Sequence, residues 1–300
     1  MKNKIPKGTI AKNRERWAYL FISVPVLFYI LVRFIPTIYA FYLSFTDWDI
    51  ISASANWIGF SNYKRLFSDK LFYKTLSNTF YYVIYGLPLS LLFGFILAYN
   101  IEKIKIGSGL FKTVYFMPYI TSMVAVAWVW RWLFQPAPIG IFNNILISMG
   151  LPMQEFLNSV EQSKGCILAA TIWSGVGFQM IIFMAGMKGI SKQYYEAAKI
   201  DGASSFNELR YITLPLLRNS FIFLLITGTI RFLRIFTQVV NMTRNSAGGP
   251  LNSSKPLVLY IYDNAFRSFD MGYASALTVI LFLIILLITL IQMRVTRDER

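Results

Sequence analysis

Six long apolar runs dominate this 300-residue sequence and leave few folds open to it. A helix needs about 20 apolar residues to cross the hydrocarbon core of a bilayer, and each run reaches that length. Charged or turn-forming residues bound the runs, which cover residues 17–44, 78–101, 111–133, 165–187, 221–242 and 273–293. The sequence therefore predicts an all-α polytopic membrane protein with six transmembrane helices.

Composition agrees with a lipid environment and excludes several classes of function. Hydrophobic residues make up 56% and charged residues 14% of the chain, against about 45–50% and about 25% in soluble domains. The net charge is +15, and the basic residues lie mainly between the apolar runs. We therefore expect these residues to determine the orientation of the chain in the membrane, and we expect no nucleic-acid partner. Cys166 is the single cysteine and there is no histidine, so the usual metal ligand sets are missing. We expect no bound metal, cofactor or catalytic residue.

Lysine and arginine near the ends of the runs predict the orientation, because cytoplasmic loops retain them. They place both termini inside, as a retained tail 1–16 and a tail 294–300 that flank a membrane domain 17–293. The loop 46–77, predicted outside, carries four basic residues among three aspartates, which weakens the contrast. The segments predicted inside carry Lys2, Lys4, Lys7, Lys12, Arg14 and Arg16, then Lys103, Lys105 and Lys112, then Lys188, Lys192, Lys199, Arg210 and Arg218, and finally Arg294, Arg297 and Arg300.

The inside loop 191–217 is too structured for a simple connector. Ser191 can cap a helix that runs to residue 200, and Asp201 with Gly202 would end it. Ser205 and Glu208 have the spacing of a capping box that opens a second helix. The loop is rich in small residues, which suit either docking in a cleft of another protein or an amphipathic segment on lipid headgroups.

The same loop resembles the EAA loop of binding-protein-dependent ABC importer permeases. The resemblance rests on Glu196-Ala197-Ala198, Gly202 and Ile212-Thr213-Leu214-Pro215. Other segments resemble the sugar branch of that family, with the maltose and glycerol-phosphate permeases. They are residues 44–48 (SFTDW), 59–63 (GFSNY), 117–118 (MP), 172–173 (IW), Thr243 with 248–250 (GGP), and 272–276 (GYASA). One departure bears on substrate identity: Thr237 follows Phe236 where the family often has an acidic residue.

The resemblance implies a permease subunit that moves a carbohydrate, and more narrowly an oligosaccharide, across the cytoplasmic inner membrane of a prokaryote by alternating access. Its implied partners are a second, non-identical permease, two ATPase subunits that bind ATP and magnesium, an extracytoplasmic sugar-binding protein and membrane lipid. The chain itself is predicted not to be an enzyme. It has no phosphate-binding loop with which to hydrolyse ATP, since the glycine- and lysine-containing residues 107–113 lack the required spacing. The residues implied in ATPase coupling are Glu196, Ala197, Ala198, Asp201, Gly202, Leu214 and Pro215.

A substrate pathway needs aromatic faces and polar groups at membrane depth. Helical spacing places four candidates of the fourth run on one face, and Arg231 and Arg234 are charges inside the fifth run. The hypothesis is that Arg234 binds sugar hydroxyls or an acidic group, with Gln238 one turn further on. In the competing interpretation, both arginines reach the interface or pair with another subunit. The candidates are Tyr119, Thr171, Ser174, Gly175, Phe178, Arg231, Arg234 and Gln238, and helix packing is the competing interpretation.

Two other classes remain as alternatives. An ion-coupled secondary transporter or channel usually needs a buried carboxylate, and an intramembrane enzyme needs a general base or a metal. None of the six runs contains aspartate or glutamate, which disfavours both.

Overall fold

The computed structural model describes residues 9–51, 55–104, 106–243 and 248–297. Of the basic residues used to predict topology, Lys2, Lys4, Lys7, Lys105 and Arg300 lie outside the described residues, as do the side chains of Lys12 and Arg297. The described chain is helical, with two isolated β-bridges and no strand. It forms two compact units, residues 1–67 with 264–280 and residues 68–263 with 281–300.

The first unit contains the first apolar run as one continuous helical segment. It comprises α1 (Thr9–Tyr29), a π-helical turn (Ile30–Phe34) and α2 (Ile35–Leu43). Pro36 has no N–H with which to continue the α-helical pattern, which accounts for the wider turn before it. The candidate span Asn13–Leu43 matches the predicted run 17–44, although the helix already begins within the predicted tail. Its apolar window is 0% buried, so lipid or another protein must cover it.

Three of the sequence segments that resemble sugar permeases meet in this unit. Buried Asn62, in α3 (Ser61–Ser68), donates its Nδ2 to the carbonyl oxygens of Ser44 at 3.0 Å and Thr46 at 2.8 Å. The Gly272 N–H donates to the carbonyl of Trp48 at 2.9 Å. Arg65 and Asp270 form an ion pair at 2.6 Å. Segments 44–48, 59–63 and 272–276 therefore support one local structure.

Replacing Asn62 with alanine should lower the free energy of unfolding by about 1–3 kcal/mol, because two buried carbonyls lose their donor. Thermal unfolding in detergent micelles measures this change. Asn13→Ala, a change to an exposed residue of α1, is the matched control and should leave the transition unchanged. Equal transitions for the two variants would contradict the assignment.

The second unit holds most of the remaining helices. They are α4 (Lys70–Glu102), α5 (Ser108–Ile120), α6 (Met123–Leu133), α7 (Ile141–Ser148), a 3-10 turn (Phe156–Asn158), α8 (Ser163–Lys188), α9 (Lys192–Ile200), α10 (Ser205–Glu208), a π-helical turn (Leu209–Thr213), α11 (Leu214–Leu216), α12 (Arg218–Leu233), α13 (Thr237–Met242) and a 3-10 turn (Pro250–Asn252). Two more helices, α14 (Leu257–Phe266) and α15 (Met271–Arg297), continue from one unit into the other.

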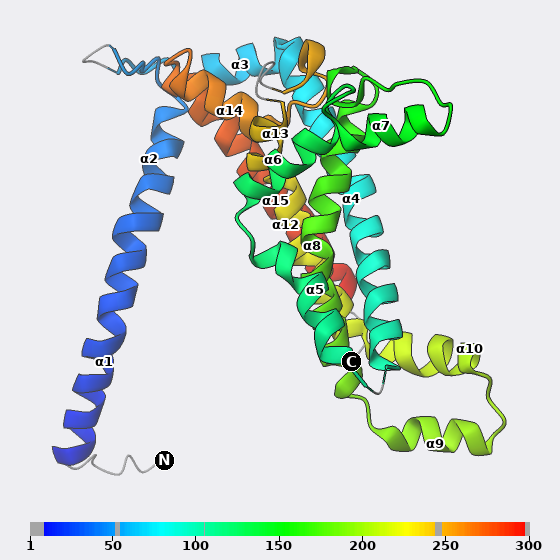
Figure 1. Ribbon diagram of the computed structural model, residues 1–300. Coiled ribbons are helices and arrows are strands. Elements are labelled where there is room, and N and C mark those ends of the chain that lie inside the picture. The colour runs from blue at the N-terminus through cyan, green and yellow to red at the C-terminus, as the bar shows by residue number, and fades with distance from the viewer. Residues whose placement is uncertain (1–8, 52–54, 105, 244–247, 298–300) are drawn as a thin grey trace. The chain divides into compact units, whose positions relative to one another are not determined.

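Helix α8 lies at the centre of this unit, packed against α4, α5 and α12 (Figure 1). Buried apolar side chains, including Ile167 and Phe183, fill the space between these helices. Polar contacts also join them: Ser90 of α4 bonds the side-chain amide of Gln179 of α8 at 2.9 Å. Near the end of α15, Gln292 donates to Thr229 of α12 at 2.7 Å. Close packing with a few interhelical hydrogen bonds is typical of helices in lipid.

The second, fourth and sixth predicted runs are confirmed as long apolar helices. The runs 78–101, 165–187 and 273–293 correspond to the candidate spans Lys70–Glu102, Ser163–Lys188 and Met271–Thr296. Helix α4 begins eight residues earlier than its apolar run because Asp69 caps it, accepting the Leu71 N–H at 2.8 Å. The described part of the chain has four such helices, or up to six if each of two bent pairs is one span.

The third and fifth predicted runs are each interrupted in the structure. The run 111–133 is divided into α5 and α6, which are bent by 97° at Thr121 and Ser122. The run 221–242 is interrupted after α12 and resumes as the short α13. A further bend of 62° separates the segment Ser205–Leu216 from α12. Apolar composition continues through these breaks, so the length of a run cannot reveal them.

The segment after α13 is held to α4 by three α4 side chains. Lys74 donates to the carbonyl of Leu251 at 2.7 Å, and the Tyr82 hydroxyl donates to that of Ser254 at 2.9 Å. Between them, Asn78 donates to the carbonyls at 252 and 255, at 3.0 and 2.9 Å. Positions 74, 78 and 82 lie on one face of α4 because they are four residues apart.

Candidate functional sites

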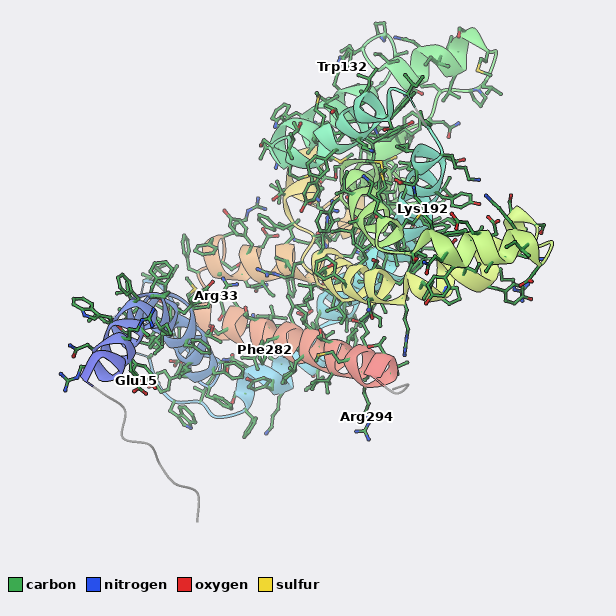
Figure 2. All side chains as sticks on the ribbon, turned by 90° about the horizontal axis from the view of Figure 1, so that it is seen from below. Glu15, Arg33, Trp132, Lys192, Phe282 and Arg294 are labelled. Atoms are coloured by element: carbon green, nitrogen blue, oxygen red, sulfur yellow. The ribbon has the colours of Figure 1, made fainter. Side chains whose placement is uncertain are left out.

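The first candidate site is the hairpin that α9 makes with the segment from α10 to α11. Figure 1 places it at the end of the second unit where α4 ends and α5 begins. Figure 2 shows Lys192 at the start of α9 and the hairpin extending away from the other helices. The Tyr195 hydroxyl and Thr213 Oγ1 are 3.0 Å apart and join the two arms.

The turn between the arms has well-defined backbone geometry. Ser191 caps α9 by accepting the Gln193 N–H, as predicted. At the other end, the Gly202 N–H donates to the carbonyl of Lys199 at 3.1 Å, and the Ala203 N–H to that of Ala198 at 2.9 Å. Gly202 has φ +74°, and a Cβ there would meet no atom within 4 Å. The turn is a Schellman motif, so the glycine is required by the backbone and not by lack of space.

The predicted capping box at Ser205 is wrong by one residue. The cap is Ser204, whose hydroxyl accepts the Asn207 N–H at 3.3 Å. Ser205 is the first residue of α10. The two serines are adjacent at the start of this short helix, and the extended backbone at residue 204 makes Ser204 the cap.

The hairpin exposes apolar side chains. Ile200 is 86% exposed, and Tyr194, Phe206 and Tyr211 are more than half exposed. The predicted coupling residues Glu196, Ala197, Asp201, Gly202 and Pro215 are exposed, whereas Ala198 and Leu214 are half-buried. Among the described residues, none bonds the side chain of Glu196. A role of this carboxylate in ATPase coupling, as the resemblance implies, would therefore depend on a contact with another protein.

The second candidate site is a cavity of about 310 Å³ between α5, α8 and α12. The rings of Tyr119 and Phe178 stack on its wall, with centroids 4.9 Å apart and planes 19° apart. Both were predicted to line a pathway. Helix α5 approaches α8 closely one turn before Tyr119, because Gly177 lies directly against the carbonyl of Tyr115 and a Cβ would collide with it. The lining comprises Tyr119, Phe178, Gln179, Leu224, Thr227, Gly228 and Arg231.

Arg231 connects the cavity to three other predicted residues. Its Nη2 donates to the carbonyl of Thr171 and to Ser174 Oγ, both at 3.3 Å. Its Nη1 lies where a Cβ at Gly175 would be. The predicted face of α8 therefore lies beside Arg231, and Gly175 leaves room for the guanidinium group.

The remaining two candidates are not brought to this cavity. Arg234 ends α12 and is exposed, and Gln238 is buried in α13. Neither lines the cavity. The break after α12 separates them from Arg231, although continuous helical spacing would have placed all three on one face. Sequence reasoning missed Gln179, Leu224, Thr227 and Gly228, because the face of α12 that packs on α8 has no distinctive pattern.

Comparison with solved structures defines the class of the fold. The structure matches a chain of a bacterial ABC transporter that is involved in the import of the acidic polysaccharide alginate, with a TM-score of 0.84 and 22% sequence identity. The match covers 95% of this chain and 96% of that chain. The protein therefore has the same fold as that chain of an ABC transporter.

Sequence comparison gives the family. Residues 67–300 match the model of the binding-protein-dependent transport system inner membrane component. The chain belongs to this family, and the predicted resemblance is confirmed. It is 34% identical over 276 residues to the probable ABC transporter permease YesP of Bacillus subtilis, covering 91% of this chain and 88% of YesP. It is 32% identical over 246 residues to the lactose transport permease LacF of Rhizobium radiobacter, covering 81% of this chain and 82% of LacF.

Proposed function

We propose that this chain is the translocation subunit of a prokaryotic ABC importer for a carbohydrate, and more narrowly for an oligosaccharide. The observation that carries the proposal is the family match over residues 67–300. Similarity to a lactose permease supports the substrate class. The cavity adds a physical reason, since stacked aromatic rings beside hydroxyl, amide and guanidinium groups suit a sugar.

Transport would proceed by alternating access, with the 310 Å³ cavity as one part of the pathway. A second, non-identical permease would complete that pathway, and an extracytoplasmic binding protein would deliver the sugar. Two ATPase subunits would bind ATP and magnesium. Closure of the two ATPase subunits on ATP would shift the permease between its inward-open and outward-open states. This requires a contact between ATPase and permease that differs between the two states.

The hairpin 191–217 is the proposed contact with the ATPase. It offers exposed apolar side chains on a fixed turn, which suits docking in a cleft of another protein. Lys103, Lys112, Arg218 and Arg294 belong to helix ends that lie at the same end of the second unit as this hairpin. A cytoplasmic hairpin would satisfy the positive-inside rule. The tails 1–16 and 294–300 would then also be cytoplasmic.

ATP-driven uptake of labelled oligosaccharides into proteoliposomes tests the proposal. The vesicles should contain this chain, its neighbouring permease and the ATPase, with the binding protein added outside. We expect uptake only with ATP inside, and at least a tenfold loss in Glu196→Ala. Glu161→Ala is the matched control. Glu161 is also exposed, but it precedes the start of α8, whereas the hairpin with Glu196 follows the end of α8. It should retain full uptake.

An ion-coupled secondary transporter is the remaining alternative. None of the three helices that line the cavity contains aspartate or glutamate, which disfavours ion coupling through this site. Uptake that follows an ion gradient without ATP would establish this alternative and contradict the importer proposal.

A further inference from the structure

We propose that the transported oligosaccharide carries a carboxylate, as in a chain of hexuronic acids, and that Arg231 binds it. This inference rests on the proposed function and narrows its substrate class. The proposal is based on one observation: a cation lies in the wall of a cavity between three helices, and none of these helices carries an anionic residue.

The charge of Arg231 is not balanced within the described chain. Its two acceptors, the Thr171 carbonyl and the Ser174 hydroxyl, are both neutral. The end of α12 contributes only a fraction of a negative charge, equivalent to about half an elementary charge. A guanidinium group cannot be deprotonated in a protein, so it needs a counter-charge or water.

The guanidinium group is anchored to α8 through Nη2, and its other N–H donors are not used by these hydrogen bonds. Both hydrogen bonds that the described structure gives it come from Nη2. An arginine has five N–H donors, so the three on Nη1 and Nε are not used by these two bonds, and Nη1 lies close to Gly175. A planar guanidinium group matches a carboxylate with two parallel hydrogen bonds. The stacked rings of Tyr119 and Phe178 line the same cavity and would contact the apolar face of a sugar ring.

Arg234 provides the matched comparison. It lies three residues further along the chain, is exposed, and does not line the cavity. Both side chains have the same charge and come from the same short stretch. A general effect of positive charge on transport would therefore involve both residues, whereas carboxylate binding in the cavity involves Arg231 alone.

The experiment uses the reconstituted complex and two labelled probes, trigalacturonic acid and the neutral trigalactose obtained by reducing its carboxyl groups. ATP-driven uptake is measured with the binding protein. Equilibrium binding is measured on the complex without it, so that the specificity of the binding protein does not enter. We expect the native complex to bind the acidic probe at least tenfold more tightly. In Arg231→Gln this preference should disappear, and in Arg231→Lys part of it should return.

The controls separate the two proposals. Arg234→Gln should keep the native preference, and size-exclusion chromatography should show intact complexes for every variant. If neither probe enters with ATP, the carbohydrate importer itself is contradicted. If both enter and bind equally, only the carboxylate inference fails. An Arg231→Gln variant that weakens assembly and lowers binding of both probes alike would show that Arg231 pairs with another subunit, which would overturn the inference.

Discussion

Replacing Gly202 with valine should abolish most ATP-driven uptake, whereas replacing it with asparagine should preserve most of it. The backbone at this position has φ +74° and ends α9 with a Schellman motif. For a residue with a Cβ, the left-handed conformation is less favourable by about 1–2 kcal/mol of free energy, and for a β-branched residue the cost is higher. Asparagine adopts the conformation more readily because its short polar side chain can bond the local backbone.

The two substitutions separate strain from contact. Nothing lies within 4 Å of a Cβ at Gly202, so the valine variant should still insert and assemble with its partner permease. Its defect should appear as weaker co-purification of the ATPase and as at least a tenfold loss of uptake in proteoliposomes. Equal activity of the valine and asparagine variants would contradict a role for the left-handed turn.

Replacing Gly177 with alanine should have the second large effect. A Cβ at this position would collide with the backbone of Tyr115 and Phe116, so α5 would have to move away from α8. Overpacking of this kind costs about 1–3 kcal/mol. Because Tyr119 is one turn further along α5, the displacement would also separate its ring from that of Phe178. We expect at least a tenfold fall in uptake and a lower unfolding temperature.

Gly165→Ala is the matched control for this change. Gly165 lies in the same helix, and a Cβ there would meet nothing within 4 Å. Alanine favours a helix over glycine by about 0.5–1 kcal/mol, so this variant should be as stable as the native chain or slightly more stable. If both alanine variants behave alike, close approach of α5 and α8 is not what the glycine provides.

The sequence predicted the helical class and the approximate positions of the six apolar runs, because hydropathy reports the lipid environment directly. It could not predict the breaks. Thr121 and Ser122 separate α5 from α6, but two hydroxyl residues do not end the long apolar run. The helices on either side of the break pack against α8 and α13. The sequence also correctly predicted α9, with Ser191 as its cap and Ile200 as its last residue, because capping residues act locally.

The candidate cavity was predicted only in part. Regular spacing predicted that Thr171, Ser174 and Gly175 share one face of α8, and in the structure these three residues lie beside Arg231. The same spacing failed for Arg234 and Gln238, because α12 ends between Arg231 and Gln238. A periodic pattern therefore locates a face only where the helix is continuous. The roles of the predicted residues in coupling and transport remain predictions.

The three hydrogen-bonding side chains on α4 also restrict how this protein can change shape. Lys74, Asn78 and Tyr82 hold four successive or nearly successive carbonyls between residues 251 and 255. We therefore expect segment 251–255 to move together with α4. Any hinge between this segment and α12 must lie before it in the chain, and residues 234–236, where α12 stops, form a joint of that kind. We therefore expect α4 and segment 251–255 to move relative to α12 as one rigid body that rotates about this hinge.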